Sequence, residues 1–106
     1  MNMKVLINNK EFNLIKANTF FKRLKGLMFK KNITTGMFFP NCNSIHTFFM
    51  FDKIDIIMID NCNKIVYLEK NVKRKIIYKK EARHTIELPK NSICEIKIND
   101  QLVFKD

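Results

Sequence analysis

Short runs of apolar residues, separated by clusters of Asn, Asp and Lys, cover most of this 106-residue chain. The runs are rich in Ile, Val and Phe, which is typical of β-strands rather than of helices. They predict strands at Lys4–Ile7, Glu11–Ile15, Met37–Phe39, Ile45–Met50, Ile54–Ile59, Ile65–Leu68, His84–Leu88 and Leu102–Phe104. The pattern therefore favours a mainly β protein, a compact barrel or jelly-roll-like sandwich of seven to nine strands.

The residues between the expected strands predict two tight turns and one helix. Asn8-Asn9 separates the first two strands, and Asn tolerates the positive φ of a two-residue hairpin turn. Asp52-Lys53 is expected to close a second hairpin, between 45–50 and 54–59. After Asn18 and Thr19, apolar residues recur at helical spacing and predict one short amphipathic helix that presents Phe20, Phe21, Leu24, Leu27 and Met28.

Length and composition indicate one globular domain spanning residues 1–106, without a linker or an internal repeat. No apolar stretch approaches the roughly 18–20 residues that cross a bilayer, and the apolar stretch at the start is too short for a signal peptide. Three cysteines at wide, unequal spacing suit free thiols, although a Cys42–Cys62 bridge is an alternative. We therefore expect a cytoplasmic protein with no membrane span.

The formal net charge of +10 raises the question of an anionic partner. Seventeen of the twenty basic residues are Lys, which indicates compositional bias as much as function. Basic stretches at Lys22–Lys31 and Lys70–Arg83, the second with Tyr78 inside it, are the candidates for nucleic-acid binding. A solvated, lysine-protected edge strand is the simpler interpretation of the second stretch.

The most apolar part of the chain contains three polar residues, His46, Thr47 and Asp55. Burial of such groups without hydrogen bonds costs about 1–3 kcal/mol each, so they form either a structural network or a site. If Met50 pairs with Asp55 across the expected hairpin, His46 lies four residues, about 13 Å, from Asp55 along the sheet. The two are then no catalytic dyad, and their partners come from elsewhere. Asp55, near a turn, is expected to accept backbone N–H bonds.

Metal and thiol chemistry find little support. Cys42 and His46 lie four residues apart, but no Cys-x-x-Cys pair accompanies them and the chain has only two histidines. We therefore predict no metal and no cofactor. A Cys42 nucleophile activated by His46 or His84 is conceivable, yet no local nucleophile signature surrounds it.

Several blocks together resemble a known family. In order, these are Arg23-Leu24-Lys25-Gly26-Leu27-Met28-Phe29, Gly36-Met37-Phe38-Phe39, Ser44–Met50 with Ile54-Asp55, Ile86-Glu87-Leu88-Pro89 and Asp100-Gln101-Leu102. They resemble domain of unknown function 192, also called uncharacterised protein family 0127, over Ala17–Phe104. The resemblance implies a compact, mainly β, jelly-roll-like domain with a short helix and no established biochemical function. Turn positions that the family usually gives to Gly are Asn63, Asn91 and Asn99 here, and Asn is the next-best residue for positive φ.

These observations lead to three hypotheses. The first is a small-ligand-binding module whose pocket, walled by Phe and Met, gathers Arg23, His46, Thr47 and Asp55. The second is a hydrolase or isomerase that uses His46 as acid or base. The third is nucleic-acid binding through the basic stretches. The oligomeric state and the identity of a ligand do not follow from the residues.

Overall fold

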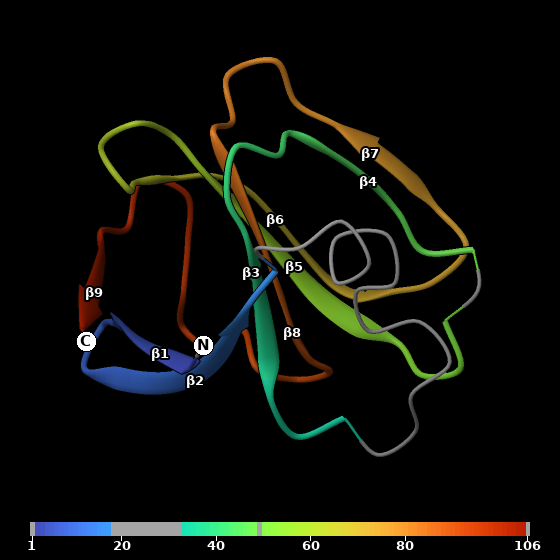
Figure 1. Ribbon diagram of the computed structural model, residues 1–106, viewed down its shortest axis with the longest axis horizontal. Helices are drawn as coiled ribbons and strands as arrows, with labels where there is room; N and C mark the ends of the chain where they lie inside the picture. Colours follow the sequence, from blue (N-terminus) through green and yellow to red (C-terminus); the bar gives the residue numbers. More distant parts are fainter. Residues whose placement is uncertain (1, 18–32, 49, 106) are drawn as a thin grey trace.

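The computed structural model describes residues 2–17, 33–48 and 50–105, and these contain nine β-strands (Figure 1). In chain order they are β1 (Asn2–Ile7), β2 (Lys10–Lys16), β3 (Gly36–Phe39), β4 (Ser44–His46), β5 (Ile54–Ile59), β6 (Ile65–Val72), β7 (Ile76–Tyr78), β8 (His84–Pro89) and β9 (Leu102–Lys105). The expected mainly β fold is confirmed. The predicted helix, and Arg23 within it, lie outside the described residues.

Seven of the strands form one curled sheet in the order β6-β5-β8-β3-β2-β1-β9. Neighbouring strands are antiparallel except β2 and β3, which run parallel. The two edge strands approach each other, since the N–H of Ile65 donates to the carbonyl of Asp100 at 3.0 Å and the N–H of Leu102 donates to that of Asn63 at 2.9 Å. The sheet is thus a half-barrel, closed at one end where β6 begins and β9 begins.

Apolar side chains on the two faces of this sheet form two separate cores. The first core fills the inside of the half-barrel and includes Leu14, Ile57, Ile86 and Leu102. The second covers the opposite face of the central strands; its members include Met37, Phe39, Ile54, Ile56, Met58, Val72 and Ile77. Because β5 contributes to both cores, all six of its residues are buried, as expected of a central strand.

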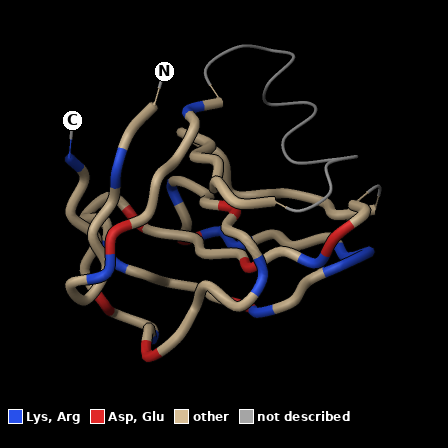
Figure 2. The backbone as a smooth tube through the Cα atoms, turned by 90° about the horizontal axis from the view of Figure 1, so that it is seen from below, with Lys and Arg blue, Asp and Glu red and all other residues tan. Residues whose placement is uncertain are grey.

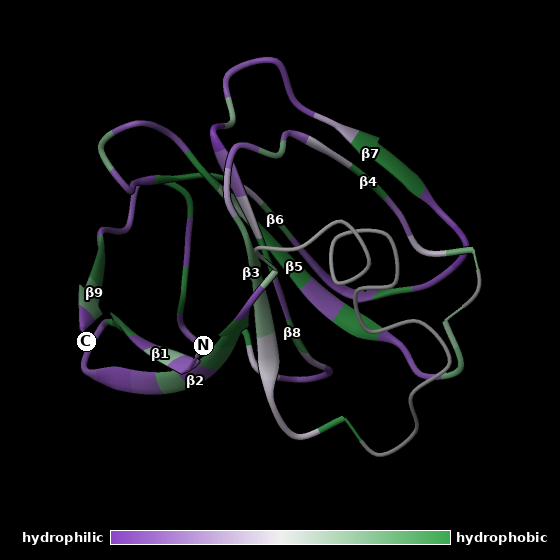
Figure 3. Cartoon of the chain, viewed as in Figure 1, coloured by the Kyte–Doolittle hydropathy of each residue, from purple (hydrophilic) through white to green (hydrophobic). Residues whose placement is uncertain are grey.

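The remaining two strands, β4 and β7, pair as an antiparallel ribbon that covers the second core. In Figure 1 the ribbon lies apart from the barrel strands, and the space between is filled by inward side chains such as Ile45 and Ile77. Figure 3 shows apolar residues on β5 and β7 and polar residues in most of the connections.

The predicted hairpin between 45–50 and 54–59 is wrong. β4 ends at His46 and pairs with β7, whereas β5 pairs with β6 and β8. A strand with two buried faces sits in the middle of a sheet, where both of its neighbours can come from distant parts of the chain. Local turn residues such as Asp52-Lys53 therefore did not reveal the partner of β5.

Asn takes the place of Gly in the turns of this chain. Asn8 and Asn9 have φ values of 50° and 68° and close the predicted β1–β2 hairpin. Asn63, Asn91 and Asn99 have φ values of 60°, 64° and 76°, which confirms that Asn supplies the positive φ at these three turns. None of the described segments forms a helix of the length and apolar character that crossing a bilayer requires.

Candidate functional site

The outer face of the β4–β7 ribbon carries the exposed side chains of the sequence-predicted site. In the register, Ser44 faces Tyr78 and His46 faces Ile76, and these four residues are exposed. The alternate residues Ile45 and Ile77 pack inward on the second core, as the two-residue period of a strand requires. One side of the ribbon is thus core and the other is surface.

His46 lies in an open hollow of about 370 Å³ on this face. Its ring stacks on Phe48, with 5.9 Å between the ring centroids and 29° between the planes. The hollow is lined by Ser44, Ile45, His46, Phe48 and Ile76. Phe48 is 47% exposed and Ile76 is 65% exposed, although both are large apolar side chains. Such a group of apolar side chains at the surface is a feature of interaction sites.

Thr47, the next residue, is fully buried and holds the end of the ribbon together. Its hydroxyl accepts the N–H of Lys75 at 2.9 Å and donates to the carbonyl of the same residue at 3.4 Å. Its own N–H also donates to that carbonyl, and its carbonyl accepts the N–H of Arg74. Thr47 therefore has a structural role beside the hollow, because its hydroxyl is bonded to the backbone of Lys75.

Asp55 is also fully buried, and its carboxylate binds three backbone N–H groups. Oδ1 accepts the N–H of Asn71 at 3.0 Å, while Oδ2 accepts those of Ser92 at 2.7 Å and Ile93 at 2.9 Å. The pairing of β5 with β6 shifts register here, with Lys70 and Asn71 of β6 opposite Asp55 alone, as in a β-bulge. The expectation that Asp55 fixes turns by accepting backbone N–H bonds is confirmed.

The structure does not bring His46 and Asp55 together. Asp55 shares a face of β5 with Ile57 and Ile59, which belong to the first core, whereas the ribbon that carries His46 covers the second core. The two polar side chains lie on opposite sides of the sheet. Of the four residues proposed to surround one pocket, His46 and Thr47 are neighbours in the chain, Asp55 lies on the opposite side of the sheet from His46, and Arg23 is not described.

A charged network lies beside the ribbon. The ammonium of Lys75 binds both carboxylate oxygens of Glu69, at 2.8 and 2.7 Å, and the hydroxyl of Tyr67 donates to the same carboxylate. Burial disfavours the charge of Glu69, but the hydrogen bonds from Lys75 and Tyr67 outweigh it, so its pKa lies below the usual value. Burial and the bond to Glu69 raise the pKa of Tyr67 to about 12. Lys79 stands over the Tyr67 ring, 4.7 Å from its centroid.

Cys42 and His84, one of the two pairs considered for thiol chemistry, are bonded to backbone groups. Sγ of Cys42 donates to the carbonyl of Ser44 at 3.3 Å, and Nδ1 of His84 accepts the N–H of Asn41 at 3.0 Å. Burial and the charge of Arg83 lower the pKa of His84, which favours its neutral form. All three cysteines have free thiols, so the alternative Cys42–Cys62 bridge is wrong.

Two features of this region were missed by sequence reasoning. Ile76 was treated as part of a basic stretch, although the alternation of Ile76, Ile77 and Tyr78 was a signal for a strand with an exposed face. Glu87 is 5% exposed and shares its face with Met37 and Ile56, so its carboxylate lies in the second core. Its position between the apolar residues Ile86 and Leu88 was the available signal.

The fold and the exposed face define a class: a small β half-barrel with a covering two-stranded ribbon. Residues 3–104 match the model of the DUF192 family, described as "Uncharacterized ACR". The chain belongs to this family, whose function is uncharacterised, and the resemblance noted in the sequence is confirmed.

Curated relatives come from archaea. A UPF0127 protein of Thermococcus kodakarensis is 36% identical over 92 residues, which cover 79% of this chain and 58% of the relative. One from Thermococcus gammatolerans is 37% identical over 92 residues, with 79% and 60% covered. The chain therefore spans about three fifths of the length of these relatives.

Two solved structures share the fold. A putative transcription regulator from Sinorhizobium meliloti superposes with a TM-score of 0.82 at 17% identity, over 97% of this chain and 92% of that one. A protein of unknown function from Novosphingobium aromaticivorans gives a TM-score of 0.78, also at 17% identity, over 97% and 84%. At this identity the likeness concerns the fold alone.

Proposed function

We propose that residues 1–106 form a single binding module that holds a small apolar or aromatic ligand on the outer face of the β4–β7 ribbon. The observation that carries the proposal is the hollow in which His46 stacks on Phe48 and Ile76 stands 65% exposed. Ligand sites are mostly apolar with a few polar groups that orient the ligand. Here the apolar walls are Phe48 and Ile76, and the orienting groups are the His46 imidazole and the Ser44 hydroxyl.

The polar side chains around the hollow favour binding over catalysis. Among the described residues that line it, Ser44 and His46 alone have polar side chains. Thr47 and Asp55, the other two polar residues of this block, are bonded to backbone groups. A hydrolase or isomerase needs a second group placed to exchange or stabilise charge at the reacting atom.

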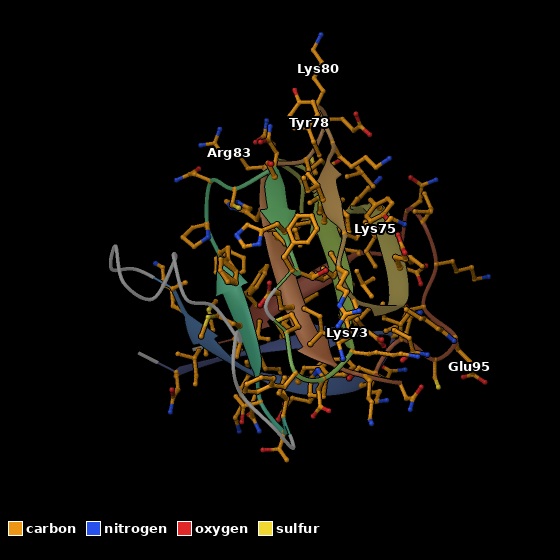
Figure 4. The ribbon with its side chains drawn as sticks, turned by 90° about the vertical axis from the view of Figure 1, so that its right-hand side faces the viewer. Lys73, Lys75, Tyr78, Lys80, Arg83 and Glu95 are labelled. Carbon is orange, nitrogen blue, oxygen red and sulfur yellow. The ribbon has the colours of Figure 1, made fainter. Side chains whose placement is uncertain are left out.

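Nucleic-acid binding has weaker support than ligand binding. Tyr78 is 59% exposed and lies close to Lys80 (Figure 4). However, Lys75 is paired with Glu69, and Lys79 lies over the Tyr67 ring. Figure 2 shows basic positions spread along the chain with acidic positions among them, rather than one continuous track for a phosphate backbone.

The proposal is tested with N-phenylnaphthylamine, a neutral fluorescent probe of apolar sites. We expect saturable binding to the native protein and at least about fivefold weaker binding to the variant Phe48→Ala/Ile76→Ser, since about 1 kcal/mol of apolar burial is lost. Val103→Ser is the matched control, because Val103 is 54% exposed on β9. Equal affinity of both variants and the native protein contradicts the proposal.

We also infer that the protein acts in the cytoplasm. In support, Cys62 and Cys94 are exposed free thiols, and exposed thiols persist in a reducing compartment. Cell fractionation with an antibody to the native protein tests this inference. Recovery outside the cytosolic fraction contradicts it.

A further inference from the structure

Three lysines from distant parts of the chain meet at one end of the half-barrel. β5 lies between β6 and β8 in the sheet, and its first residue, Ile54, pairs with Val72 on one side and with Pro89 on the other. Lys53 immediately precedes β5, Lys73 immediately follows β6, and Lys90 immediately follows β8. The sheet register thus places the three lysines at adjacent strand ends.

Around these strand ends lies an open, mostly polar hollow of about 400 Å³. It is lined by Phe51, Asp52, Lys53, Asn71, Lys73, Lys90 and Asn91. Among the described residues, the lining therefore has three ammonium groups and a single carboxylate. Phe51, which is 50% exposed, is the one apolar side chain among these residues.

The floor of this hollow is held in place before any ligand arrives. The buried carboxylate of Asp55 binds the N–H groups of Asn71 and of Ser92, and so ties the end of β6 to the turn after β8. Asn71 and Asn91 both adopt positive φ, 53° and 64°. The lysine stems therefore start from fixed backbone positions, which reduces the entropy lost when an anion is bound.

One of the three ammonium groups is already oriented. Nζ of Lys73 donates to the carbonyl of Phe51 at 3.2 Å, so it is held at the backbone of Phe51. In Figure 4, Lys73 lies well below the Tyr78 and Lys80 tip of the ribbon. The hollow is thus distinct from the His46 hollow, which is lined by other residues.

We propose that this hollow binds a small organic phosphate. A phosphate monoester carries a charge of about −1.5 to −2 near neutral pH and three acceptor oxygens, which suit several lysines that act as point charges. The half-exposed Phe51 ring offers a wall for a flat or apolar group attached to the phosphate. The proposal does not depend on ligand binding at the ribbon, since none of the residues that the structure describes lines both hollows.

Phenyl phosphate, which combines a phosphate with a ring, is a suitable probe. In a titration of the ¹⁵N-labelled full chain at constant ionic strength, we expect saturable shifts of the amides of Lys53, Asn71 and Asn91. Inorganic phosphate should shift the same amides with weaker affinity, because it lacks the contact with Phe51. Phenol alone should leave them unchanged.

Charge-matched variants separate a site from general attraction by a basic protein. Lys53→Gln/Lys90→Gln should weaken phenyl phosphate binding at least tenfold. Lys80→Gln/Lys97→Gln, which removes the same charge at exposed positions elsewhere, should change it less than twofold. Lys73→Gln alone should weaken binding as well, and its amide spectrum shows whether the loss of the bond to Phe51 disturbs the fold.

Two results overturn the proposal. One is equal weakening by both double variants, which shows diffuse attraction. The other is tighter, steeply salt-dependent shifts of the same amides by a single-stranded oligonucleotide, which assigns the surface to nucleic acid. Phe48→Ala/Ile76→Ser should leave phenyl phosphate binding intact, so the outcomes for the two hollows are independent.

Discussion

Asp55 shows how one polar residue is accommodated in an apolar strand. Its carboxylate serves three backbone N–H groups, from the bulge of β6 and the turn after β8, without help from another side chain. Thr47 does the same for the backbone of Lys75. Of the three polar residues in this apolar part of the chain, Asp55 and Thr47 hold backbone segments in place, whereas His46 is exposed.

Replacement of Asp55 by Ala should destabilise the protein by about 3–5 kcal/mol, because three buried N–H groups lose their acceptor at about 1–3 kcal/mol each. Urea unfolding measures the loss. Asp60→Ala is the control, since Asp60 also accepts two backbone N–H groups, those of Cys62 and Lys64, but in a partly exposed turn where water can replace it. A loss at Asp55 no larger than that at Asp60 would show that the buried network is not required.

His84 should make stability depend on pH. Its pKa is lowered in the folded state by burial and by Arg83, so the unfolded chain binds the proton more readily. Stability should be fully present above about pH 6.5, the usual His pKa, and should fall as the pH drops from there toward the lowered value. Urea unfolding between about pH 7.5 and 5.5 tests this for the native protein and for His84→Gln. The dependence should diminish in His84→Gln; its persistence there would assign it to another group.

The position of a strand in this fold depends on whether one or both of its faces pack on a core. β5 contributes side chains to both cores and therefore takes a position between two partners, while β4 and β7, with one face each on the second core, form the covering ribbon. Gly36 allows β3 to lie unusually close to its two neighbouring strands. It lies in β3 between β2 and β8, and a Cβ there would stand 2.7 Å from the carbonyl oxygen of Glu87 and 2.7 Å from Cδ2 of Leu14.

Gly36→Ala should therefore destabilise the sheet by about 1–3 kcal/mol, because a backbone carbonyl must move to accept the methyl group. Thermal or urea unfolding provides the measurement. Asn13→Ala, at an exposed position of the neighbouring strand β2, should stay within about 0.5 kcal/mol of the native protein. Equal stability of Gly36→Ala and the native protein would mean that β2, β3 and β8 can separate at no cost.

For the whole molecule, the net charge of +10 is a source of self-repulsion. The described part of the chain measures 30 × 27 × 26 Å, close to the screening length of about 30 Å at 10 mM salt. At low salt, charges on opposite sides of the molecule therefore still repel one another. The ion pairs Lys4–Glu11, Lys75–Glu69 and Lys105–Glu11 are partly or largely exposed and offset little of this repulsion.

Raising KCl from about 10 mM to about 200 mM should therefore increase the free energy of unfolding, by on the order of 1 kcal/mol. Urea titrations at several salt concentrations give this quantity directly. Lys80→Gln/Lys97→Gln should reduce the salt dependence without loss of stability at low salt. A decrease of stability with salt would show that attractive ion pairs outweigh the repulsion.

Strand positions and turn chemistry were determined by the sequence itself. Runs rich in Ile, Val and Phe between turn residues located β1, β2, β5, β8 and β9, and Asn at positions 63, 91 and 99 marked turns of positive φ, because these are local properties of a few adjacent residues. The ordered motif blocks also identified the family. Sequence patterns were sufficient for features that depend on a few adjacent residues.

Only the tertiary structure decided which distant segments meet. The partners of β5, the three backbone donors around Asp55, and the meeting of Lys53, Lys73 and Lys90 all depend on long-range strand pairing. Such pairing is selected by the fit of two cores against a curled sheet, a property of the whole chain. For the same reason, sequence alone could name His46 and Asp55 together but could not place them on opposite sides of the sheet.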